Sequence, residues 1–182
     1  MEDIISKAYV RTLFALIGAE LGIPANLLID CKEYQNQPES GWATSLKGVN
    51  WIYINLRDLV EALNKAIAVN GFLKFDGLSW LQVRNIKIAL FCVLIHEYSH
   101  IYLTGSSRSL IGLTETDYFN MLKPLGDRVK IGEIINRERT PEEITKENIW
   151  QDKQHDENFY THLRINAHRC GRILEELKEE GR

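Results

Sequence analysis

The sequence is short of cysteine and of any excess of charge of one sign. Its three cysteines, Cys31, Cys92 and Cys170, are odd in number and show no CxxC spacing. This argues against a disulfide framework and against a cysteine-based zinc site. The formal net charge is only -3 over 182 residues, so the charge does not indicate a nucleic-acid partner or an anionic membrane. We expect a cytoplasmic protein.

Long hydrophobic segments are also missing. The longest apolar run, residues 88–95, is much shorter than the roughly 20 residues that a membrane-spanning helix needs. The N-terminal segment MEDIISKAYVRTLFALIGAEL is interrupted by charges at Glu2, Asp3 and Lys7, which predicts a soluble amphipathic helix and not a signal peptide. With 45% hydrophobic residues, the chain is expected to fold as a single domain over residues 1–182, without membrane contact.

The hydrophobic pattern predicts a mainly helical α+β fold with a small antiparallel sheet. Helices are expected over residues 4–21, over 56–70, from a cap at Asp76 or Ser79 to about Leu103, and over 156–178. A hairpin is expected in GWATSLKGVNWIYINL, with its turn over residues 47–50 and Trp51–Asn55 as its second strand. Glycine and proline interrupt the apolar clusters of residues 105–154, which indicates an irregular insert with one or two short helices.

The segment HEYSH has the residue types and the spacing of two metal ligands and a catalytic base. His96 and His100 are four residues apart in the third predicted helix, so both imidazoles lie on one face and can bind one ion. Glu97 follows about 100° around the helix axis, where a carboxylate can take a proton from a metal-bound water. The run IALFCVLI indicates that this helix is buried, and buried polar side chains need the partners that a metal supplies. The competing interpretation is a pair of ordinary helix histidines.

A catalytic zinc ion usually has three protein ligands and leaves its fourth position to water. The segment QHDENFYTHLRINAHRC supplies the candidates for the third ligand, which are His155, Glu157, His162 and His168. His155 can approach an ion from the start of the last helix, with Asp156 as its cap. His162, about two turns later, is a candidate for contacting a ligand or the transition state. His168 is the best candidate for a plain structural or surface histidine.

HEYSH followed by HDENFY resembles the pattern of SprT-like and WLM-type metallopeptidases. In those families an HExxH helix is followed by a third histidine in a segment close to H-D/G-x-x-F-W/Y. The residues at these positions here are His155, Asp156, Phe159 and Tyr160. The resemblance implies a zincin-like domain with an HExxH active-site helix and one zinc ion on His96, His100 and His155. It further implies hydrolysis of peptide bonds in a protein or peptide substrate, with Glu97 as general base.

The resemblance leaves the third ligand and the oxyanion donor open. His155 lies 55 positions after His100, farther than is usual in those families. A gluzincin-like alternative uses Glu157 instead, as ImmA-like peptidases use a downstream carboxylate. The candidates for oxyanion stabilisation are Tyr160, His162 and Tyr102. Trp51–Asn55 resembles the edge strand along which zincins bind an extended peptide.

Two further functions fit the same motif. One is a non-catalytic binding or regulatory module with a structural zinc ion. The other is an SprT-like protease that acts on DNA-protein crosslinks, although the cysteine-rich zinc module of many SprT proteins is missing here. The insert is basic at Lys123, Arg128, Lys130, Arg137 and Arg139. Because acidic residues are interleaved with these, a mixed-charge solvated surface is favoured over a nucleic-acid patch.

Overall fold

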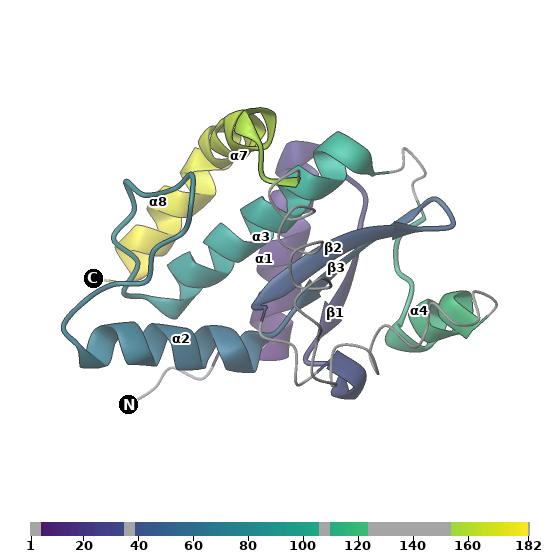
Figure 1. The fold of residues 1–182 in the computed structure, drawn as a ribbon, viewed down its shortest axis with the longest axis horizontal. Coiled ribbons are helices and arrows are strands. Elements are labelled where there is room, and N and C mark those ends of the chain that lie inside the picture. The colour runs from purple at the N-terminus through teal and green to yellow at the C-terminus, as the bar shows by residue number, and fades with distance from the viewer. Residues whose placement is uncertain (1–4, 35–38, 106–109, 124–153, 182) are drawn as a thin grey trace, which may run out of the picture.

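The fold is described here from a computed structural model, in which residues 5–34, 39–105, 110–123 and 154–181 are placed. These residues form an α+β structure with six α-helices and one three-stranded sheet (Figure 1). The strands are β1 (Asn26–Ile29), β2 (Gly41–Leu46) and β3 (Val49–Ile54). The helices are α1 (Lys7–Leu21), α2 (Leu56–Ala68), α3 (Ile86–Thr104), α4 (Glu115–Leu122), α7 (Glu157–Arg169) and α8 (Gly171–Glu180). The predicted α+β class is confirmed.

The sheet is mixed, so the prediction of an antiparallel sheet is wrong for one of its two strand pairs. Its order is β1-β3-β2, with β2 antiparallel and β1 parallel to β3. Because β1 and β2 pair with opposite sides of β3, β3 is the central strand, and the expectation that Trp51–Asn55 forms an edge is also wrong. The sequence did not indicate β1, because its four residues, NLLI, are too few to show a strand period. The β3 run VNWIYI is buried at all six positions, as a strand covered on both faces requires.

The hairpin between β2 and β3 is confirmed, but its turn is shorter than predicted. Lys47 and Gly48 both have positive φ, 51° and 79°, which is the conformation of a two-residue type I′ turn. β3 therefore begins at Val49, two residues before the predicted start. The turn is compact because its backbone twist matches the twist of the two strands that it joins.

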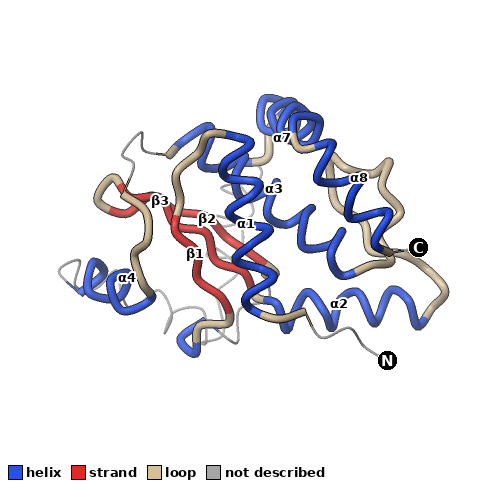
Figure 2. The backbone as a smooth tube through the Cα atoms, turned by 180° about the vertical axis from the view of Figure 1, so that it is seen from behind, coloured by secondary structure: helices blue, strands red, loops and turns tan. Residues whose placement is uncertain are grey.

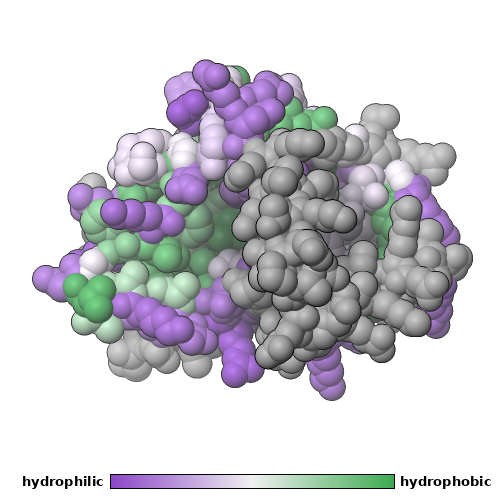
Figure 3. Space-filling model, in the orientation of Figure 1, coloured by the Kyte–Doolittle hydropathy of each residue, from purple (hydrophilic) through white to green (hydrophobic). Residues whose placement is uncertain are grey.

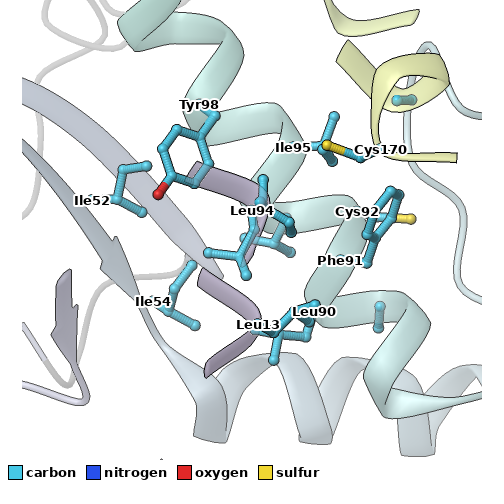
Figure 4. Packing of buried hydrophobic residues seen from close by; sticks show 14 of the residues in the cluster. Leu13, Ile52, Ile54, Leu90, Phe91, Cys92, Leu94, Ile95, Tyr98 and Cys170 are labelled. Atoms are coloured by element: carbon cyan, nitrogen blue, oxygen red, sulfur yellow. The ribbon is translucent and has the colours of Figure 1, made fainter. Parts of the chain in front are cut away.

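Helix α3 is the centre of the main core. It packs against α1, α2, α7, α8 and the strands β2 and β3, and Figure 2 shows α1 crossing the back of the molecule beside it. In Figure 4 its Leu94 points towards Ile52 and Ile54 of β3, and its Leu90 lies beside Leu13 of α1. The window Ile86–Leu103 is long and apolar enough to span a membrane, which the shorter run 88–95 did not indicate. However, 61% of that window is buried inside the protein, as in the core helix of a soluble protein.

The segment before α3 is not helical, so the predicted caps at Asp76 and Ser79 are wrong. α3 begins at Ile86, and the Asn85 side chain accepts a hydrogen bond from the Lys87 N–H at 2.8 Å. Leu78, Leu81 and Val83 of this segment are buried. Their spacing imitates a helix, but they insert into the core from an irregular chain. Figure 3 shows the molecule in the orientation of Figure 1. In the left half of that view, apolar surface lies between hydrophilic side chains above and below it.

The other helices match their predictions with changed bounds. α1 begins at Lys7 after a Ser6 cap, and Asp156 caps α7 by accepting from the Phe159 N–H at 2.8 Å. The predicted last helix is divided at Cys170 into α7 and α8. α4 is one short helix of the expected insert, whose residues 124–153 lie outside the described part, as do four of the five basic residues named above, Arg128, Lys130, Arg137 and Arg139.

Candidate metal centre

Three histidines meet where α3 packs against the start of α7. His96 and His100 project from α3 one turn apart, and His155 directly precedes Asp156, the N-cap of α7. The Nε2 atoms of His96 and His100 are 3.1 Å apart. His155 Nε2 lies 3.1 Å from that of His96 and 3.0 Å from that of His100. The three side chains are therefore close enough to share one metal ion.

The three imidazoles converge on a common point. Their ring centroids are 4.8 to 5.0 Å apart, whereas their Nε2 atoms are only 3.0 to 3.1 Å apart. A proton on any of these nitrogens points into the centre of the triangle, so a cation satisfies the three lone pairs better than mutual hydrogen bonds do. His96, His100 and His155 would hold such an ion through Nε2, and separations of 3.0 to 3.1 Å are compatible with three metal–nitrogen bonds of about 2.0–2.1 Å.

The histidines on α3 have the protonation state that metal binding requires. Burial, with a contribution from the neighbouring histidines, lowers the pKa of His96 to about 3 and the pKa of His100 to about 4. Both imidazoles are therefore neutral at pH 7, because a lowered histidine pKa favours the uncharged form at every pH above it. Neutral imidazole is the form that coordinates zinc and other first-row metals.

The Phe159 ring packs against all three imidazoles. Its side chain is fully buried, and its ring is stacked on His100 at 4.4 Å between centroids. The centroids of His96 and His155 are each 4.9 Å from it. Phe159 was part of the HDENFY segment, but the sequence argument assigned it no role. The four-residue spacing between His155 and Phe159 could have indicated this contact, because it brings two side chains to the same side of a helix start.

Glu97 follows His96 in α3 and is outside the group that can share an ion. Its side chain is 5% exposed, and burial, with a smaller contribution from Glu39, raises its pKa well above the usual carboxyl range. A β-carbon on Gly41 would lie 3.1 Å from Glu97 Oε1 and 2.8 Å from Val93 Cγ1. Gly41, the first residue of β2, thus makes room for the carboxylate. Sequence reasoning missed this, although glycine within a strand is a known sign of close approach.

The remaining candidates lie around the triad. Glu157 is exposed in the first turn of α7 and is not in the group that can share an ion. The Tyr160 ring lies 6.4 Å from the His155 ring and packs over Gly77, where a β-carbon would be 2.7 Å from the tyrosine ring. His162 instead contacts Tyr102, with 4.7 Å between the ring centroids.

His168, on the same helix α7, is exposed, as expected for a surface histidine.

Comparisons with protein-family models, curated proteins and solved structures match nothing to this chain. Function is therefore inferred from the residues of the chain and from the geometry of the centre.

Proposed function

We propose that the protein is a zinc-dependent metallopeptidase. The observation that carries this proposal is the convergence of His96, His100 and His155 on one point, with the buried side chain of Glu97 next to His96 in α3 and outside the ligand group. A bound zinc ion would supply a Lewis acid and would lower the pKa of a water molecule. In its ionised form Glu97 would take the proton of the attacking water and pass it to the leaving amine.

The position of β2 supports an extended peptide as the substrate. β2 is an outer strand of the described sheet, and its first residue, Gly41, is adjacent to the Glu97 carboxylate. A substrate strand paired with β2 by backbone hydrogen bonds would carry its scissile bond past Glu97. Of the candidates for the oxyanion donor, Tyr160 has a ring contact with His155, so we assign it this role. The resemblance to SprT-like and WLM-type peptidases supports the same chemistry.

The decisive experiment is Glu97→Gln, which keeps the size of the side chain and removes the base. We expect the variant to bind one zinc ion per chain and to lose activity on an unfolded protein such as casein by a factor of about 10² to 10⁴. Glu61→Gln, an exposed glutamate on α2 with 59% of its side chain accessible, is the matched control and keeps parental activity. A Glu97→Gln protein that binds zinc and hydrolyses as fast as the parent would contradict the proposal.

The alternatives predict different outcomes in the same assays. A structural zinc module binds the metal without hydrolysing any substrate, and such sites usually have four protein ligands, whereas the described group has three. A DNA-associated protease binds single-stranded DNA with an affinity that falls steeply with salt. Free, buried cysteines at all three positions support a reducing cytoplasm as the compartment.

A further inference from the structure

A buried polar contact joins the two helices that carry the metal centre. The Asn166 side chain on α7 donates from Nδ2 to Ser99 Oγ on α3 at 3.0 Å. Ser99 Oγ in turn donates to the carbonyl oxygen of Ile95 at 2.7 Å. Ser99 is 0% and Asn166 is 1% exposed. Because water does not reach these groups, separating them would leave the Asn166 amide without this acceptor, at a cost in free energy.

The surroundings of this contact are apolar. Phe159, Leu163 and Ala167 of α7 and Ile95 of α3 belong to the main core cluster, and Figure 4 shows Ile95 beside Cys170 at the end of α7. Apolar contacts have little directional preference, so such side chains can repack in more than one arrangement. A buried hydrogen bond has a defined length and direction, and a buried polar pair can therefore select one register of two packed helices.

The register of α7 on α3 decides where His155 lies. Asn166 follows His155 by eleven positions, which is on the order of 15 Å along a helix that rises 1.5 Å per residue. The Ser99 contact therefore holds α7 about three turns beyond His155, beside the part of α3 that carries His96 and His100. Without that contact, a small pivot of α7 would move His155 relative to His96 and His100. Metal–ligand distances at a well-formed site lie within about 0.2 Å of their usual values, so such a movement would disturb the centre.

We propose that Ser99 and Asn166 are a positioning pair, which sets the register of α7 on α3 and so presents His155 to the metal held by His96 and His100. Neither residue touches the metal or the substrate in this role. The inference rests on the metal centre of the proposed function but not on peptidase activity.

The test uses the full chain, freed of metal by a chelator and reloaded with zinc or cobalt. Asn166→Leu and Ser99→Ala should each raise the zinc dissociation constant about tenfold, the lower end for residues that orient ligands indirectly. They should also change the visible spectrum of bound Co²⁺, which reports the coordination geometry. The double variant Ser99→Ala/Asn166→Leu replaces both polar groups and should recover most of the lost urea midpoint. It should not recover the zinc affinity or the parental cobalt spectrum.

A cavity variant separates positioning from general loss of stability. Leu63→Ala, at a buried position on α2, should lower the urea midpoint and leave the cobalt spectrum of the parent unchanged. If the double variant recovers both the midpoint and the spectrum, or if the single variants alter neither zinc affinity nor spectrum, the pair has no positioning role. A parent protein that binds no metal would instead contradict the metal centre, and with it this inference.

Discussion

The two faces of the sheet are packed in different ways. On the face towards α3, β2 contributes the small residues Gly41 and Ala43, and β3 contributes Ile52 and Ile54. On the opposite face lies an aromatic cluster that covers the sheet beneath α4. Its rings are Tyr34, Trp42, Trp51, Tyr53, Tyr118 and Phe119. The alternation of side chains along each strand separates the two sets.

The difference indicates where chemistry is possible. Small residues on the α3 face let the helix approach the strand closely enough to hold the Glu97 carboxylate against Gly41. The aromatic face buries large rings instead. Its polar atoms are few, and among the described residues Trp51 Nε1 has no hydrogen-bond partner while its ring lies against Tyr118. We therefore expect mutations on the α3 side to change metal binding or activity, and mutations on the aromatic side to change stability alone.

The largest effect is expected at the third ligand. His155→Ala should weaken zinc binding about a thousandfold, equivalent to about 4 kcal/mol, because two imidazoles cannot enclose the ion. Glu157→Gln changes an exposed side chain two residues away and should leave the affinity within about twofold of the parent. Competition with a chelating dye measures both constants. The reverse result would make Glu157 the ligand and would remove His155 from the centre.

Next in size is the effect of filling the space at Gly41. Gly41→Ala places a methyl group 3.1 Å from Glu97 Oε1, and a shift of about 1 Å in a reacting group can reduce the rate by about a hundredfold. We expect kcat/KM to fall by up to this factor while zinc still binds one ion per chain. Gly171→Ala is the matched control, because nothing lies within 4 Å of its new β-carbon. Equal activity in the two variants would mean that Gly41 does not position Glu97.

Replacing one buried aromatic residue on each side of the sheet, Phe159 and Tyr118, compares the two sides directly. Phe159 is 0% and Tyr118 is 4% exposed, and replacing either by leucine should lower the free energy of unfolding by about 1–3 kcal/mol. Only Phe159→Leu should also weaken zinc binding, because its ring supports all three imidazoles. Urea titration and zinc titration on the same samples test this. Weaker zinc binding in Tyr118→Leu would remove the distinction between the faces.

The smallest effect is expected within the aromatic cluster. The Tyr34 and Tyr118 hydroxyl oxygens are 3.1 Å apart and share a hydrogen bond, so Tyr34→Phe should cost about 0.5–1.5 kcal/mol of stability. Activity and zinc affinity should not change. The urea midpoint measures the effect, and a change in activity would show that the two faces are coupled.

The sequence predicted those parts of the structure that depend on neighbouring residues. Helix α2, the hairpin of β2 and β3, and the Asp156 cap follow from spacing and from turn or cap residues. The predictions failed where the deciding contact is distant. The parallel partner β1 was not recognised, and the buried residues of 71–85 imitated a helix, because an apolar side chain can insert into a core from an irregular segment as well as from a helix.

In the candidate centre, too, the sequence predicted the local features and not the distant contacts. The sequence by itself determined that His96 and His100 share one face of a buried helix, because a four-residue spacing brings side chains together within a helix of known pitch. Only the tertiary structure decided that His155 joins them, that Phe159 lies against all three imidazoles and that Gly41 makes room for Glu97. Apart from that of Phe159 with His155, these contacts bridge 55 or more positions of the chain. Their geometry comes from the packing of α3 against α7 and β2, which no local pattern specifies.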